Sequence, residues 1–146
     1  MNIKVKILRD GAHLPHLATD GAAACDLYAL LSEPVTLAPG QRYPVPTGIA
    51  IALPDKNSVA VVCARSGLAL KQGLALANGI GVIDSDYRGE IFVAIINNDK
   101  ESKTIENGER IGQLMILPVI VPEYEVVSEL DETERGSGGF GSTGTK

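Results

Sequence analysis

Apolar and polar residues alternate with a period of two along much of the chain, which is typical of half-buried β-strands. At the start, Ile3, Val5 and Ile7 alternate with lysines. The same pattern predicts strands over residues 49–53 and 59–63. Residues 91–96 form an almost continuous apolar strand, and residues 111–121 supply one long strand or two short ones.

Turn signals separate these strands at close spacing. Pro39 and Gly40 occupy the two central positions of a type II turn, and further turns are expected at residues 97–100 and 106–109. The one helical candidate is residues 66–72, with Ser66 as an N-cap and Gly73 as the terminator. Many short strands with one short helix predict an all-β fold, a sandwich or a barrel.

The length and composition fit one domain with its own core. The chain has 146 residues, of which 45% are hydrophobic and 21% charged, with sixteen glycines and eight prolines in keeping with many turns. From Ser128 the character changes to the acidic SELDETE and then to RGSGGFGSTG. We therefore predict a β-domain over residues 1–127 and a flexible C-terminal arm over residues 128–146.

Charge and hydropathy narrow the function classes. The net charge of −5 argues against nucleic acid or an anionic membrane as a partner. The opening MNIKVKIL lacks the apolar core of a signal peptide, and the longest apolar run, residues 114–121, is interrupted by Pro118. Cys25 and Cys63 fit no metal or redox spacing and are expected to be reduced thiols. We predict a soluble, cytoplasmic protein.

ARSGLALK, residues 64–71, is a candidate phosphate cradle. Arg65 and Ser66 supply donors, Gly67 permits close approach of the backbone, and N–H groups at a helix start point outward. Taken alone, the segment is more simply explained as a strand-to-helix turn with an exposed arginine.

NGIGVIDSDYRGEI, residues 78–91, places Asp84 and Asp86 two positions apart in a tight turn. These carboxylates suit a general base that prepares a water, or a two-carboxylate metal site. They also suit a structural role, since aspartate commonly supports hairpin turns. Tyr87 belongs either to the core or to a ligand surface.

Other chemistry is weakly represented. His13 and His16 flank Pro15 without nearby Cys or carboxylate partners, so we reject a metal site there. No motif of covalent catalysis is present.

RGSGGFGSTG, residues 135–144, is by composition a disordered tail. It also fits a lid, because an aromatic ring stacks on a nucleobase and an arginine forks onto phosphate.

Five segments in order resemble the trimeric deoxyuridine triphosphatase (dUTP diphosphatase) family over nearly the whole chain. The first segment, residues 22–29, departs slightly from the family pattern, because it has Ala24 where the family usually has glycine. The segments are AAACDLYA (22–29), ARSGLALK (64–71), NGIGVIDSDYRGEI (78–91), GERIGQLMILPV (108–119) and RGSGGFGSTG (135–144).

The resemblance implies a distorted jelly-roll barrel of the β-clip type. It also implies a homotrimer with active sites between subunits, in which the C-terminal arm reaches a neighbouring subunit. The implied reaction is Mg²⁺-assisted hydrolysis of dUTP to dUMP and pyrophosphate, which limits uracil in DNA and supplies dUMP for thymidylate synthesis.

The resemblance assigns roles residue by residue. Asp84 would be the base that deprotonates water for in-line attack on the α-phosphorus, and Asp26 would act indirectly, through water on the metal. Tyr87 would lie beneath the deoxyribose and leave no room for a ribose 2′-hydroxyl. The remaining residues would bind substrate: Asn78, Val82, Ile83 and Phe92 the uracil edge, Arg65, Ser66, Gly67 and Gln113 the phosphates, Arg135, Ser142 and Thr143 the terminal phosphate, and Phe140 the uracil face.

Two other functions remain as rivals. A dCTP deaminase, or its bifunctional relative, shares the fold, but its deaminating glutamate is expected in the segment that here reads VIDSDYRG. A non-catalytic nucleotide-binding or signalling protein could keep the fold, yet it has no need of Asp84, Arg135 and Phe140 together.

Overall fold

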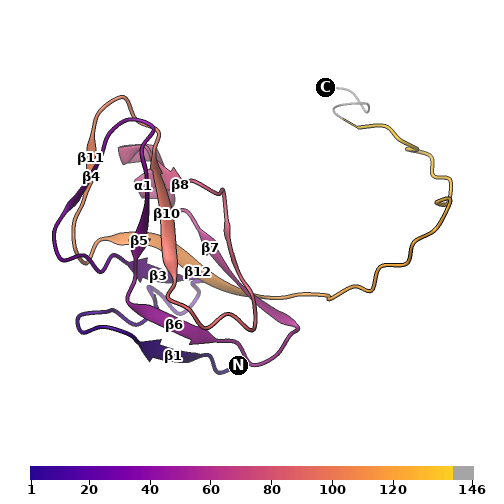
Figure 1. The fold of residues 1–146 in the computed structure, drawn as a ribbon, viewed down its shortest axis with the longest axis horizontal. Helices are drawn as coiled ribbons and strands as arrows, with labels where there is room; N and C mark the ends of the chain where they lie inside the picture. Colours follow the sequence, from indigo (N-terminus) through magenta and orange to yellow (C-terminus); the bar gives the residue numbers. More distant parts are fainter. Residues whose placement is uncertain (140–146) are drawn as a thin grey trace.

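The computed structural model describes residues 1–139, which form twelve strands and one short helix (Figure 1). Among these residues no helix is long and apolar enough to cross a membrane. The elements are β1 (Lys4–Ile7), β2 (His16–Leu17), β3 (Cys25–Tyr28), β4 (Val35–Leu37), β5 (Arg42–Pro46), β6 (Ile49–Ala52), β7 (Ser58–Cys63), α1 (Ser66–Gln72), β8 (Leu74–Leu76), β9 (Gly81–Ile83), β10 (Phe92–Asn97), β11 (Lys103–Ile105) and β12 (Arg110–Pro118).

The strands pair antiparallel in four sheets. The largest has five strands in the order β2-β3-β12-β7-β9, and a second has the order β5-β10-β8. Two-stranded pairs, β1-β6 and β11-β4, complete the body. The prediction of a mostly β fold with one short helix is therefore confirmed.

One apolar core lies between the sheets. The residues packed most completely include one from each of many different strands, which ties the sheets together. The apolar residues with at most 1% of their surface exposed are Leu27, Ala29, Leu37, Val45, Ile49, Ala60, Leu74, Ile91, Val93, Ile95, Ile105 and Ile111.

Period-two alternation and continuous apolar runs located five strands but not every inward-facing side chain. β1, β6, β7, β10 and β12 lie where the pattern predicts them. Ile7 is nevertheless 44% exposed, because β1 belongs to a two-stranded pair at the surface. β12 is one continuous strand, and it ends at Pro118.

The helix has the predicted bounds but a different cap. Arg65 is the N-cap residue, with extended backbone angles and no capping side-chain hydrogen bond, so the expectation that Ser66 caps the helix is wrong. Gly73 ends the helix as expected, with φ 66° and its N–H donated to the carbonyl of Ala69. The turn at Gly40 also has the expected geometry, with φ 75°.

A β-bulge interrupts the pairing of β12 with β3. Arg110 lies opposite Tyr28 and Gly112 opposite Leu27, so Ile111 is an extra residue on β12. Arg110 and Gln113 would face opposite sides of a regular strand, since they are three residues apart. The extra residue brings both to the side of Asp26.

After β12 the chain leaves the body. The last hydrogen bond to the body in this region joins the N–H of Val119 to the carbonyl of Asn57. Residues 120–139 then extend away as a long arm (Figure 1). Ile120, Tyr124 and Val126 on this arm are 90–99% exposed. The domain boundary at residue 127 remains a prediction.

Candidate active site

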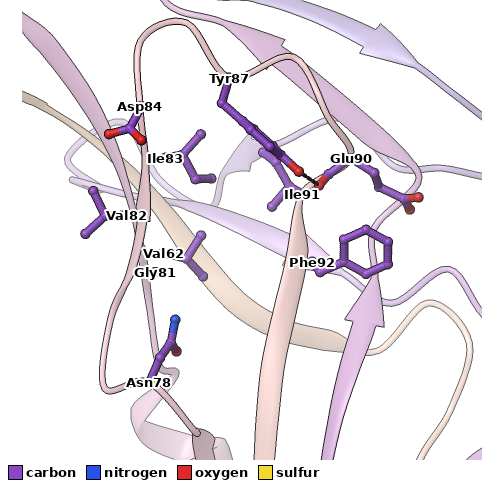
Figure 2. Close-up of a pocket in the computed structure, with 10 residues that line it drawn as sticks. All are labelled: Val62, Asn78, Gly81, Val82, Ile83, Asp84, Tyr87, Glu90, Ile91 and Phe92. Atoms are coloured by element: carbon purple, nitrogen blue, oxygen red, sulfur yellow. Dashed lines mark hydrogen bonds between the residues drawn. The ribbon is translucent and has the colours of Figure 1, made fainter.

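The connection from β9 to β10 encloses a pocket of about 240 Å³ (Figure 2). β9 belongs to the five-stranded sheet and β10 to the three-stranded sheet, so the pocket opens where the two sheets diverge. Its lining contains six of the predicted site residues: Asn78, Val82, Ile83, Asp84, Tyr87 and Phe92. Val62, Gly81, Glu90 and Ile91 complete the lining.

The inner wall of the pocket is rigid. Ile83 and Ile91 are buried core residues, and Val62 packs behind them. A Cβ atom at Gly81 would lie 3.1 Å from Cβ of Val62, so the absent side chain lets the strand backbone form the wall. Such a wall can present main-chain N–H and carbonyl groups to a flat heterocycle.

Tyr87 lies on the loop between β9 and β10 rather than in the core. Its ring is aimed from the loop toward the start of β10 (Figure 2), and its hydroxyl donates to the carbonyl of Glu90 at 3.0 Å. A Cβ atom at Gly89 would lie 2.3 Å from the Tyr87 hydroxyl oxygen, so the ring is in contact with bare backbone. The residue is 45% exposed, which leaves one side available to a ligand.

Asp84 lies at the end of β9, on the side of the pocket opposite Phe92 (Figure 2). Its carbonyl accepts the N–H of Tyr87 at 3.1 Å, which closes the turn. Arg88 donates to the carbonyls of Ser85 and Tyr87 at 2.8 Å and further stiffens this turn. The Asp84 carboxylate thus stands on an ordered loop at the pocket edge, as a base for a bound water requires.

A second cluster forms around Asp26, which is only 5% exposed. Arg65 donates from Nε to Asp26 Oδ1 at 3.1 Å, and Arg110 donates from Nη1 to Asp26 Oδ2 at 3.2 Å. Arg65 also donates to the carbonyl of Arg110 at 3.2 Å. Two arginines thus neutralise one buried carboxylate, and the remaining N–H groups of Arg65 are available to an anion.

Strand register brings Gln113 into the second cluster. Gln113 on β12 lies opposite Asp26 on one side and opposite Cys63 on the other. Directly opposite residues project from the same face of a sheet. Gln113 therefore lies on the same face as Asp26.

Cys25 is next to Asp26 in the sequence. Burial, and to a smaller degree the charge of Asp26, raises the pKa of the Cys25 thiol, which keeps that cysteine protonated.

The two clusters lie on opposite faces of the five-stranded sheet. Val62 lines the pocket and pairs with Gly81, whereas the adjacent Cys63 pairs with Gln113. Because successive residues of a strand point to opposite faces, the pocket is on one face and the Asp26 cluster on the other. Among residues 1–139, the lining of the pocket includes none of Asp26, Arg65, Arg110 and Gln113.

Residues 1–139 contain no group of three or more His, Cys, Asp or Glu side chains arranged to hold a metal ion. His13, which we excluded as a ligand, stacks on Tyr28 with ring centroids 4.7 Å apart. Asp26 keeps lone pairs for further donors although each oxygen already accepts one arginine N–H.

Ser66 and Gly67 are exposed at the start of α1, and a Cβ atom at Gly67 would meet nothing within 4 Å. Arg135 lies on the extended arm and donates from Nε to the carbonyl of Gly138 at 3.0 Å. The predicted residues Phe140, Ser142 and Thr143 lie outside the described residues.

Sequence reasoning missed two charged residues of these clusters. Arg110 belongs to the fourth segment, but its contact with Asp26 depends on the bulge in β12. Glu90 lines the pocket and bonds to the distant Arg9. Neither contact carries a local signal, since the partners are more than 80 residues apart in the sequence.

The chain is similar to known proteins over nearly its whole length. Residues 10–144 match the dUTPase family. A deoxyuridine 5'-triphosphate nucleotidohydrolase of Desulfitobacterium hafniense is 56% identical, covering 98% of this chain and 97% of the relative.

Solved structures give the same picture. A mutant dUTPase of Staphylococcus bacteriophage 80alpha, bound to dUpNHpp, superposes with a TM-score of 0.89 at 28% identity and 99% coverage of both chains. A mutant dUTPase of phage phi11 of S. aureus, described with a structural Mg(II) ion, shares the fold with a TM-score of 0.81 at 24% identity. It covers 90% of this chain and 100% of that one.

Proposed function

The chain belongs to the dUTPase family, and on that basis we propose that it is a dUTP diphosphatase that hydrolyses dUTP to dUMP and pyrophosphate. The observation that carries the proposal is the pocket between β9 and β10, whose lining contains the residues to which we assign binding of the base and the sugar and activation of water. In the cell this reaction would limit uracil in DNA and supply dUMP for thymidylate synthesis in the cytoplasm.

We assign recognition of uracil to the pocket wall. Asn78 and the backbone of Val82, Ile83 and Phe92 would pair with the carbonyls and N–H of the uracil edge. Cytosine presents the reversed pattern and would leave polar groups of the wall unpaired, which costs far more than a poor apolar fit. Thymine would be excluded by steric contact of its methyl group with the rigid wall, and Phe140 would cover the face of the base.

Asp84 would accept a proton from the water that attacks the α-phosphorus. The new bond forms between that water oxygen and phosphorus, the bond to the bridging oxygen breaks, and pyrophosphate leaves. The exposed position of Asp84 at the pocket edge and the ordered turn that follows it support its role as the base. No residue of the enzyme needs to become covalently attached to the nucleotide.

The phosphates would be bound by Arg65, Ser66, Gly67 and Gln113, with Arg135, Ser142 and Thr143 at the terminal phosphate. Arg65 is suited to this because Asp26 and the Arg110 carbonyl fix its guanidinium in place. Bound Mg²⁺ would offset the phosphate charge and polarise the phosphoryl oxygens. Asp26 would contact it only through water.

We further propose a homotrimer with a jelly-roll subunit of the β-clip type. The base pocket and the Asp26 cluster lie on opposite faces of one sheet, so a complete site would take one from each of two chains. Apolar side chains on the outer face of that sheet support such contacts: Val82 is 60% and Leu117 38% exposed. The arm spans roughly 40 Å from Ser128 to Phe140 when extended, enough to cross a neighbour.

Pyrophosphate release with Mg²⁺ tests the function. We expect rapid release from dUTP and rates lower by at least about a hundredfold for dCTP, dTTP and UTP. Equal rates with dUTP and dTTP, or no release from dUTP, would overturn the proposal. Release of ammonia from dCTP would instead indicate a deaminase.

A further inference from the structure

Glu90 connects the pocket to a part of the chain outside the five family segments. Its Oε1 atom accepts the N–H of Gly48 at 2.7 Å and forms an ion pair with Nη2 of Arg9. Its side chain is 17% exposed, so the carboxylate is largely withdrawn from water. We call Arg9, Gly48 and Glu90 the clasp.

Gly48 is a fixed anchor for the clasp. Its φ of 72° and the position of Leu30, whose Cδ2 would lie 2.3 Å from a Cβ atom, both require glycine. On either side of it, Thr47 donates its hydroxyl to the Ile91 carbonyl at 2.7 Å, and Ile49 accepts the Ile91 N–H at 2.9 Å. The backbone from Glu90 to Ile91 is therefore held against this turn at several points.

Tyr87 depends on this held backbone for its position. Its hydroxyl bonds to the main-chain carbonyl of Glu90, whose side chain is bound in the clasp. With 45% of its surface exposed, Tyr87 has less packing to fix its ring than a core aromatic has. In Figure 2 the Glu90 carboxylate points away from the pocket while its carbonyl faces the Tyr87 hydroxyl.

We propose that the clasp determines sugar specificity by positioning Tyr87 against the deoxyribose. This rests on the proposed function, in which the Tyr87 ring fills the space that a ribose 2′-hydroxyl would occupy. Holding the Glu90 carbonyl in place holds the ring in place, and a loosened carbonyl lets the ring withdraw and admit UTP. Arg9 and Glu90 are thus positioning residues, and Arg9 precedes the residues matched to the family.

The test compares kcat and KM for dUTP and UTP in the full chain. We expect Glu90→Ala to lower the ratio of dUTP to UTP specificity roughly tenfold, the effect of losing a hydrogen bond to a charged group. The change should come mainly from faster UTP hydrolysis. Arg9→Met, which leaves the Gly48 contact, should have a smaller effect of the same sign, and Arg9→Lys should restore the ratio.

A double-mutant cycle adds a second measurement. Tyr87→Phe removes the hydroxyl that bonds to the Glu90 carbonyl. The effects of Tyr87→Phe and Glu90→Ala on the dUTP-to-UTP specificity ratio should therefore not be additive. Lys103→Met is the control, because it breaks the 3.1 Å ion pair with Asp99 on a different hairpin. It should leave the ratio unchanged.

The outcomes separate the two levels of the argument. A wild-type chain that does not hydrolyse dUTP overturns the proposed function, and the clasp falls with it. Suppose instead that the wild-type enzyme is selective for dUTP, and that the Arg9 and Glu90 variants are folded by thermal unfolding and keep the specificity ratio. That result overturns the proposal for the clasp alone. Equal losses with both nucleotides, or additive effects in the cycle, also overturn it. If Glu90→Ala does not fold, Arg9→Met decides.

Discussion

Asp26 is a buried carboxylate whose two oxygens are each held by a different arginine. Removing either arginine would leave one oxygen of a carboxylate that is only 5% exposed without its hydrogen-bond donor, which is costly. The pair with Arg65 does more than balance charge, because it fixes the orientation of a guanidinium assigned to phosphate. A residue to which we assign only an indirect role in the reaction thus positions one of the proposed phosphate ligands.

The role of Asp84 can be separated from nucleotide binding. Asp84→Asn keeps the size of the side chain but removes the base, so we expect turnover of dUTP to fall by roughly 10²–10⁴-fold. Binding of dUpNHpp should persist, measured by calorimetry.

Asp86→Asn provides the matched control in the same turn. Near-normal turnover of the Asp84 variant would show that another group is the base. Comparable losses in both variants would favour a two-carboxylate metal site.

Among the elements, α1 could be located from its sequence to the residue because Gly73 provides a strong stop. The wrong cap assignment has a physical origin: a capping residue has extended backbone, and that conformation belongs to Arg65. The shortest strands, such as β2 and β11, escaped prediction. Two or three residues carry no measurable period, and their pairing partners are distant in the sequence.

The end of α1 makes a direct test of this reasoning. Gly73 has φ 66°, and a Cβ atom there would lie 2.9 Å from backbone N and Cβ of Asp99. We expect Gly73→Ala to destabilise the fold by about 1–2 kcal/mol through left-handed strain alone, and further through the clash. Urea unfolding measures this loss of unfolding free energy.

Gly67→Ala is the control within the same helix. Its Cβ atom would meet nothing within 4 Å, and alanine is the better helix former, so unfolding free energy should be unchanged or rise by up to about 1 kcal/mol. Equal destabilisation by both substitutions would show that backbone strain at Gly73 is not the cause.

For the whole molecule, the proposed shared site predicts complementation between two inactive variants. Asp84→Asn impairs the pocket and Arg65→Met the phosphate cluster, which lie on opposite faces of one sheet. If sites combine parts of two chains, co-refolding the two variants should restore activity to a sizeable fraction of wild type. Pyrophosphate release before and after mixing measures it.

Simple averaging of the two variant activities would exclude a shared site. A co-refolded mixture of wild type with Asp84→Asn sets the reference for dilution of intact chains.

The arm supplies a second prediction at this scale. Truncation after Glu134 removes Arg135, Phe140 and the glycine-rich residues but leaves the apolar residues that directly follow β12, so the chain should fold and keep its trimeric mass by sedimentation. Activity should fall by tenfold or more, since a charge-assisted phosphate contact contributes about 1.5–3 kcal/mol. Unchanged activity would refute the lid.

The sequence predicted the pocket better than the second cluster, and the difference is one of distance along the chain. The pocket residues from Asn78 to Phe92 follow one another along β9, the loop after it and the start of β10, so their proximity is local. The meeting of Asp26, Arg65 and Arg110 requires the register of three strands. That register is set by the packing of the whole core rather than by any local pattern.

The bulge at Ile111 makes the number of residues in this segment as important as their identity. Ile111 is buried in the core, while Arg110 reaches Asp26 on the other face of the sheet. Deleting Ile111 would restore regular pairing with Arg110 still opposite Tyr28, but it would remove a side chain from the core, where Ile111 is 1% exposed. This stretch should therefore accept exchanges of side chains far more readily than any insertion or deletion.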